Sequence, residues 1–239
     1  VLNCIDKHRD APVWDQTFMV WEGEDKTEQQ TLSYRELDRE VSRLAQGLRD
    51  LGIRQGDVVA LYMPNLPETF IAFFAVMKLG AILLPLFSGF GPAPIVSRLN
   101  HGEAKAVITA NGTWRRGTPA PLKSVLDTAL EQAPSVQHVV VVDRSGLSVE
   151  TPMRAERDHW WHHITAGKDG DIATVEMPAD APAILLYTSG TTGEPKGCVW
   201  TQIGFIGSMV TRDIIICGDF KPTDRFFFMS DMGWMVGAM

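Results

Sequence analysis

The chain has 239 residues, with 22 Lys and Arg against 29 Asp and Glu, so its net charge is −7 near neutral pH. Hydrophobic residues make up 45% of it, which is typical of a folded globular domain and too apolar for a disordered chain. The acidic balance argues against nucleic acid as the main partner, because binding to a phosphate backbone requires clustered Lys and Arg. Three widely spaced cysteines exclude a disulfide scaffold and favour a reducing compartment, so we expect a cytoplasmic protein.

The stretch 70–87 is apolar apart from Lys78 and resembles a membrane span in length. A span would carry the Lys78 charge into the bilayer, and Gly80 and Pro85 would interrupt it. We therefore interpret this stretch as a buried helix, a turn and a buried strand, and expect no membrane span. No secretory signal is visible at the start, which lacks a basic region followed by an apolar run.

The order of the expected elements indicates the fold class. Residues 1–32 are polar and are expected to be an irregular segment packed on a domain that covers 33–239. A capping box, Ser33 with Glu36, begins an amphipathic helix that Gly52 ends. Further helices are expected at 67–79, 95–100, 122–133 and from about 201, and strands at 58–62, 81–86, 105–109, 139–142, 184–187 and 226–229. This alternation predicts an α/β fold with mainly parallel sheets and helices on both faces, which binds ligands beyond the carboxyl ends of its strands.

Residues 187–197, Tyr-Thr-Ser-Gly-Thr-Thr-Gly-Glu-Pro-Lys-Gly, form the strongest motif. They follow an expected strand and precede an expected helix. Their glycines allow a ligand to approach the backbone closely, and their amides and hydroxyls can hold phosphate oxygens beside the charge of Lys196. The spacing differs from that of a Walker A loop. The motif predicts a phosphate-binding loop; the alternative is a solvated loop without a ligand.

Residues 188–197 resemble the AMP-binding signature of the adenylate-forming enzymes, which include acyl-CoA synthetases, peptide-synthetase adenylation domains and luciferases. Residues 230–237 resemble the downstream Asp-x-Gly-Trp-x-x-Gly segment of that family. The acetyl-CoA synthetase branch is the most similar one. The segments that carry this similarity are 21–24, 62–65, 87–90, 105–110, 121–123 and 157–161.

The resemblance implies an AMP-forming acyl-CoA synthetase that uses ATP, Mg²⁺ and coenzyme A to activate a short or medium carboxylic acid. A carboxylate would attack the α-phosphate of ATP, and the thiol of coenzyme A would then take the acyl group from acyl-AMP. The residues implied are Thr188, Ser189, Gly190, Thr191, Thr192, Gly193 and Lys196 for the ATP phosphates, Trp234, Met235, Val236 and Gly237 for the acyl pocket, and Gly89 and Arg115 for coenzyme A.

Simpler interpretations stay open at several positions. Met235 and Val236 are also compatible with plain core packing, and Arg115 with a solvated surface arginine. We interpret His159, His162 and His163 as part of a packed surface helix rather than a zinc site. Cys198 is expected to be a buried, inert thiol.

The resemblance also implies that the chain is the N-terminal part of the family's large domain, without the C-terminal lid domain. Catalytic residues are expected beyond Met239, no metal ligand is assigned, and the chain alone is expected to be inactive. An incomplete sheet would favour self-association. Two alternatives stay open: an adenylating enzyme with a carrier-protein thiol as acceptor, and a non-catalytic nucleotide-binding module.

Overall fold

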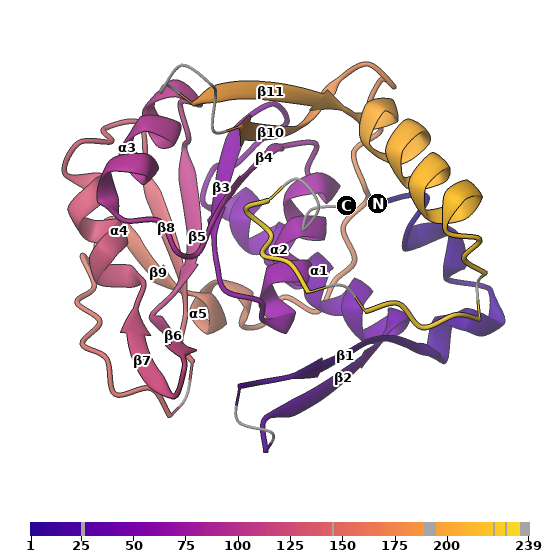
Figure 1. Ribbon diagram of the computed structural model, residues 1–239, viewed down its shortest axis with the longest axis horizontal. Coiled ribbons are helices and arrows are strands. Elements are labelled where there is room, and N and C mark those ends of the chain that lie inside the picture. Colours follow the sequence, from indigo (N-terminus) through magenta and orange to yellow (C-terminus); the bar gives the residue numbers. More distant parts are fainter. Residues whose placement is uncertain (25–26, 145, 189–194, 222, 228, 235–239) are drawn as a thin grey trace.

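A computed structural model gives the fold (Figure 1) and describes residues 1–24, 27–144, 146–188, 195–221, 223–227 and 229–234. Its centre is a seven-stranded sheet in the order β11-β10-β4-β3-β5-β8-β9. All neighbours are parallel except β10 and β11, which are antiparallel. The strands are β3 (Val58–Tyr62), β4 (Ile82–Leu86), β5 (Ala106–Ala110), β8 (His138–Val142), β9 (Asp158–Trp160), β10 (Pro182–Thr188) and β11 (Lys196–Thr201).

Helices cover both faces of this sheet, which confirms the predicted α/β class. Figure 1 shows α3 and α4 on one side and α1 and α2 on the other. The inner strands are nearly continuous runs of buried apolar residues, as expected for parallel strands covered on both faces. The helices are α1 (Tyr34–Asp50), α2 (Pro67–Lys78), α3 (Pro92–His101), α4 (Lys123–Leu130), α5 (Trp161–Thr165), η1 (Asp6–His8), η2 (Pro12–Asp15) and η3 (Ile203–Cys217), the last wound as a π-helix.

Helix α1 begins and ends where the sequence predicts. The Glu36 amide donates to Ser33 Oγ at 3.2 Å, and the Ser33 amide donates to Glu36 Oε2 at 2.8 Å, so the capping box is complete. Gly52 follows the helix with φ +86°, a conformation that a residue with a Cβ rarely adopts. The face that α1 buries against α2 and the sheet consists of Leu37, Val41, Leu44 and Leu48.

The stretch 70–87 forms the end of α2, a turn and β4, as predicted. Within the part of the chain that the structure describes, no helix combines the length and apolar character needed to cross a bilayer. Gly80 has φ +66° and connects the two elements.

Four segments differ from the expectation. Residues 17–33 form a hairpin of β1 (Thr17–Glu22) and β2 (Gln29–Ser33), and a second hairpin pairs β6 (Gly112–Arg115) with β7 (Thr118–Pro121). The end of the motif 187–197, from here on called the Gly/Thr motif, and the residues after it form strand β11 before the helix starts, because the run Cys198–Trp200 pairs with β10. The prediction of a strand at 226–229 is wrong at its described positions, which adopt no regular element. Apolar side chains form a core strand only where a partner lies beside them, and here Phe226, Phe227 and Met229 are exposed.

Candidate functional site

The ends of four parallel strands carry the residues that the sequence singles out. Strand β3 ends at Tyr62 and β4 is followed by the turn 87–90, while β5 leads into β6 and Arg115. Strand β10 ends at Thr188, the second residue of the Gly/Thr motif. Because parallel strands present their carboxyl ends at one edge of the sheet, these segments share the edge at which open α/β folds bind ligands.

Ser88, in the turn after β4, contacts two charged residues from distant parts of the chain. Its hydroxyl donates to Asp231 Oδ2 at 2.5 Å, and its amide faces the same oxygen at 3.4 Å. Arg115 Nη2 lies 3.4 Å from Ser88 Oγ. Ser88 is buried, whereas Arg115 is exposed. The turn therefore joins the predicted coenzyme A residue Arg115 to the segment that precedes the predicted acyl pocket.

Segment 230–234 lies against the turn after β4. The rings of Trp234 and Phe87 are 5.5 Å apart, and Asn65 Nδ2 donates to the Ser230 carbonyl at 2.7 Å. A Cβ on Gly233 would lie 2.1 Å from the Phe87 amide nitrogen, so only glycine allows this approach. A Cβ on Gly89 would lie 2.4 Å from the Phe87 ring, so a side chain there would force that ring to move. The structure thus brings Gly89, Arg115 and Trp234 into one cluster.

Tyr62 fixes the other end of this turn. Its hydroxyl donates to the Phe90 carbonyl at 2.9 Å. Burial raises the pKa of Tyr62 to about 12; the Arg115 charge opposes the rise and the Asp231 charge adds to it. Tyr62 therefore remains protonated near neutral pH and keeps its hydrogen-bond donor.

The Gly/Thr motif connects β10 to β11. Thr188 and Lys196 face each other as a pair at the end of these two strands, and both are exposed. The other predicted phosphate residues, Ser189, Gly190, Thr191, Thr192 and Gly193, lie outside the described residues, as do Met235, Val236 and Gly237 of the acyl pocket.

Helix α3 connects the motif to the cluster. The Arg98 guanidinium lies over the Phe90 ring at 4.4 Å and over the Tyr187 ring at 5.4 Å. His101 Nδ1 is 2.5 Å from the Tyr187 hydroxyl. Tyr187 and Thr188 are the last two residues of β10, so α3 contacts the end of β10 beside the Gly/Thr motif. Sequence reasoning missed Arg98 and His101, because nothing in their local pattern indicates which ring they contact.

A comparison with protein families bears on this arrangement. The model of the family described as "AMP-binding enzyme" matches residues 6–239. The chain belongs to the AMP-binding enzyme family.

Its relatives within the AMP-binding family agree with the resemblance to acetyl-CoA synthetases. The chain is 39% identical to the acetyl-coenzyme A synthetase of Rhodopirellula baltica over 98% of its own length and 35% of the relative. It is 41% identical to the acetyl-coenzyme A synthetase of Mycobacterium bovis, over 98% of its own length and 36% of that relative. The fold matches acetoacetyl-CoA synthetase from Streptomyces lividans with a TM-score of 0.84 and 29% identity, over 94% of this chain and 33% of that one. The chain thus spans about a third of the length of these proteins.

The structure also bears on two predictions made for residues outside this cluster. The expectation of a buried Cys198 is wrong: the side chain is exposed, because β11 is the edge strand of the sheet. His159 lies in β9 rather than in a helix and approaches His138 on the neighbouring strand, with Nδ1 of His138 3.2 Å from Nε2 of His159. Among the described residues, no three His, Cys, Asp or Glu side chains gather closely enough to hold a metal ion.

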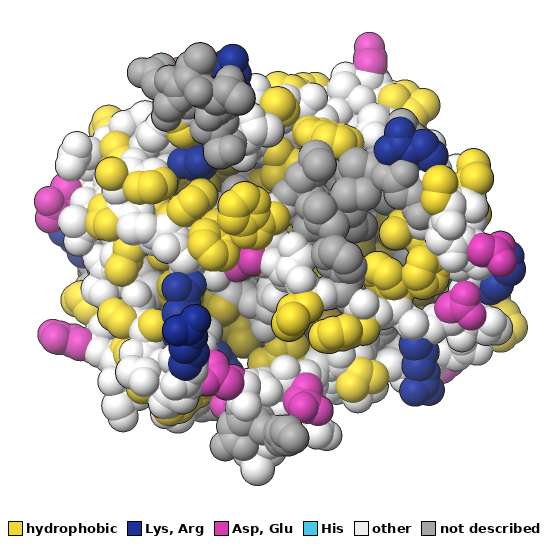
Figure 2. Space-filling view, in the orientation of Figure 1, with side chains coloured by type: hydrophobic (Ala, Val, Ile, Leu, Met, Phe, Trp, Pro, Cys, Tyr) yellow, Lys and Arg dark blue, Asp and Glu magenta, His cyan; other side chains and the backbone are white. Residues whose placement is uncertain are grey.

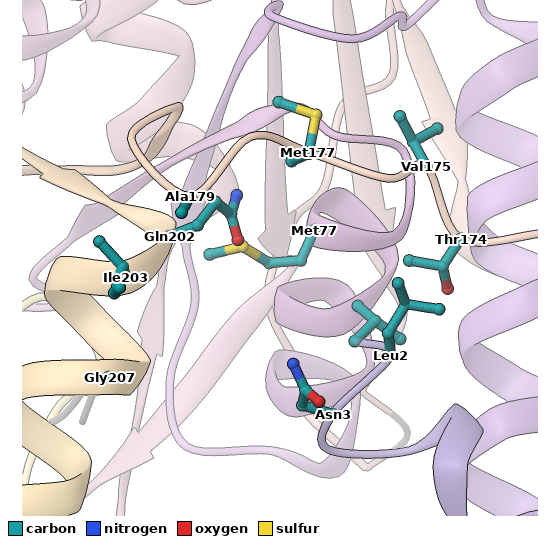
Figure 3. A pocket seen from close by; sticks show the side chains of 11 residues that line it. Leu2, Asn3, Met77, Thr174, Val175, Met177, Ala179, Gln202, Ile203 and Gly207 are labelled. Atoms are coloured by element: carbon teal, nitrogen blue, oxygen red, sulfur yellow. The ribbon is translucent and has the colours of Figure 1, made fainter.

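A groove of about 330 Å³ opens elsewhere on the chain, between the N-terminus, the segment 174–179 and the start of η3 (Figure 3). Met77 and Met177 point into it from α2 and from that segment. None of the predicted site residues lines this groove. The candidate site is therefore the strand-end cluster and not the groove.

Proposed function

We propose that the protein is an AMP-forming acyl-CoA synthetase, which activates a short or medium carboxylic acid as acyl-AMP and then forms the thioester with coenzyme A. The observation that supports this most directly is the cluster of Gly89, Arg115 and Trp234 around the turn after β4. In this proposal one edge of the sheet carries an apolar wall for the acyl group and a positive charge for a phosphate of coenzyme A.

The proposed reaction has two transfers. An oxygen of the carboxylate bonds to the α-phosphorus of ATP, and the bond to pyrophosphate breaks. The sulfur of coenzyme A then bonds to the acyl carbon, and AMP leaves with the bonding electrons while the thiol proton is released. Both nucleophiles come from substrates, so the protein mainly positions groups and balances charge.

The chain's own residues have distinct proposed roles. Thr188, Lys196 and the hydroxyls and amides between them would hold the β- and γ-phosphates. Trp234 and Phe87 would contact the acyl group. Arg115 is exposed, and its side chain donates to an uncharged partner, the Ser88 hydroxyl, so its charge is available for a phosphate. Mg²⁺ would neutralise phosphate charge, but the described residues offer no cluster of ligands for it, and no step above depends on a protein-bound metal.

We also propose that the 239 residues alone do not catalyse the reaction, because they correspond to about a third of the length of the relatives. Pyrophosphate exchange by the purified chain tests this directly, and robust exchange would contradict it.

Binding by the chain tests the phosphate loop separately. We expect weak binding of Mg-ATP by calorimetry, weakened about tenfold in Lys196→Ala, because the variant removes a charge beside the phosphates. Lys7→Ala is the matched control, since Lys7 is an exposed lysine in η1. No binding to folded wild-type chain at millimolar Mg-ATP, or an equal loss in Lys7→Ala, would refute the proposed loop.

A further inference from the structure

We propose that Ser88 is a positioning residue that joins the two substrate sites. Its hydroxyl donates to Asp231, which orders the segment carrying Trp234, and accepts from Arg115, which faces coenzyme A. The inference rests on the proposed function for the identity of the ligands, but the Ser88 contacts themselves do not depend on it.

The direction of the hydrogen bonds follows from the chemistry of the three groups. An ionised carboxylate can only accept, and a guanidinium can only donate. The Ser88 hydroxyl has one hydrogen, which goes to Asp231 Oδ2 at 2.5 Å, and its lone pairs remain for Arg115 Nη2 at 3.4 Å. Bonds to charged partners are stronger than bonds between neutral groups, so the two charges fix the hydroxyl.

On the acyl side, Asp231 transmits the position of Ser88 to the backbone before Trp234. Its Oδ1 accepts the Gly233 amide at 2.8 Å, and its own carbonyl accepts the Trp234 amide at 3.0 Å. One carboxylate oxygen of Asp231 therefore bonds to Ser88, and the other bonds to the turn 231–234. Without the Ser88 hydroxyl, the Oδ2 contact reduces to the Ser88 amide at 3.4 Å.

On the coenzyme A side, Ser88 keeps Arg115 oriented without neutralising it. A direct ion pair with Asp231 would occupy the guanidinium and compete with a phosphate. Instead, the uncharged Ser88 hydroxyl contacts both Asp231 and Arg115. The remaining N–H groups of the planar guanidinium are available for phosphate oxygens.

The test combines coenzyme A binding by calorimetry with hydrogen exchange at the Gly233 and Trp234 amides. We expect Ser88→Ala to weaken coenzyme A binding about three- to tenfold, the size of one ordinary net hydrogen bond, and to speed exchange at both amides. Ser88→Thr keeps the hydroxyl and is expected to restore both readouts toward wild type. Ser148→Ala, at an exposed serine, is the control that changes neither.

Arg115→Ala is the background variant that distinguishes a positioning role of Ser88 from a general loss of structure. Because Ser88 acts on coenzyme A through Arg115, Ser88→Ala is expected to cause no further loss of affinity in Arg115→Ala, while it still speeds exchange at Gly233 and Trp234. The inference would be overturned if Ser88→Ala lowered the affinity for coenzyme A equally in wild type and in Arg115→Ala. Unchanged amide exchange at Gly233 and Trp234 in Ser88→Ala would also overturn it. If the folded wild-type chain bound no coenzyme A, the proposed function and the role of Arg115 in this inference would be rejected. Hydrogen exchange at Gly233 and Trp234 would then be the test of the link between Ser88 and Asp231.

Discussion

Lys78 and Asp6 form an ion pair inside the protein although 72 residues separate them: Lys78 Nζ lies 3.3 Å from Asp6 Oδ1. The Lys78 side chain is fully buried, and a second carboxylate, Asp38, lies 3.5 Å from the same nitrogen. Arg9 contacts both aspartates. The single charge in the apolar stretch 70–87 is therefore the point at which the N-terminal segment and α1 attach to α2.

Replacing Lys78 with methionine is expected to lower the free energy of unfolding by about 3 kcal/mol, because two part-buried carboxylates lose a buried cation. Lys7→Met, at an exposed lysine, is expected to have little effect. Chemical denaturation of both variants measures the difference. Equal stability of Lys78→Met and wild type would show that Arg9 alone balances the two aspartates.

The capping box of α1 predicts a smaller effect. Ser33→Ala removes the acceptor of the Glu36 amide and is expected to cost about 1 kcal/mol of unfolding free energy. Ser33→Thr retains the hydroxyl, which accepts from the Glu36 amide and donates to Glu36 Oε2 at 2.8 Å, and is expected to be close to wild type. If thermal or denaturant unfolding gave the two variants the same stability, the cap would have no role in holding α1.

Gly233 permits the close contact between segment 230–234 and β4. Gly233→Ala would place a Cβ 2.1 Å from the Phe87 nitrogen and 2.3 Å from its Cα, so the segment must move away. We expect faster amide exchange at Trp234 and a weaker near-ultraviolet signal from the Trp234–Phe87 pair. Gly91→Ala is the matched control, because a Cβ there meets no atom within 4 Å. Unaltered exchange at Trp234 in Gly233→Ala would contradict this packing.

The pair His138 and His159 predicts a loss of stability in mild acid. Burial lowers the pKa of His138, and the nearby His159 and Lys105 lower it further; burial also lowers the pKa of His159. The unfolded chain, with histidine pKa values near 6.5, then binds more protons than the folded chain, so stability is complete above that pH and falls as the pH drops below it.

The test is the unfolding free energy measured between pH 7 and pH 5. We expect a shallower decrease in the double variant His138→Gln, His159→Gln, since the groups that resist protonation are gone. His163→Gln, at an exposed histidine, is expected to keep the wild-type slope. A double variant with an unchanged slope would assign the acid sensitivity to other groups.

Exposed apolar side chains predict self-association of the chain. Figure 2 shows hydrophobic side chains on the face that it draws. The exposed large apolar side chains of β11, η3 and the segment after it are Val199, Ile203, Ile215, Ile216, Phe226, Phe227, Met229 and Trp234. We expect concentration-dependent association in sedimentation velocity, reduced in the double variant Phe227→Ser, Met229→Ser, because large apolar surface favours association. A monomer at all concentrations would contradict this prediction.

Local patterns predicted most of the elements, and the reason is visible in particular residues. The Ser33 and Glu36 pair lies within four residues, and the apolar runs of β3, β4 and β8 are read directly from the chain. Strand β11 was missed because its pairing with β10 depends on two strands meeting across the motif. The exposed residues Phe226, Phe227 and Met229 were misjudged because an apolar run does not reveal whether a surface is present to cover it.

The sequence by itself determined the family, the alternation of strands and helices, and the identity of Gly89, Arg115 and Trp234 as site candidates, since these depend on motifs and on periodicity along the chain. Only the tertiary structure decided that Ser88 and Asp231 meet, that Arg98 lies between Phe90 and Tyr187, and that Lys78 has carboxylate partners. The physical reason is that hydrogen bonds and ion pairs act over a few ångströms in space, and folding alone determines which distant side chains come within that range.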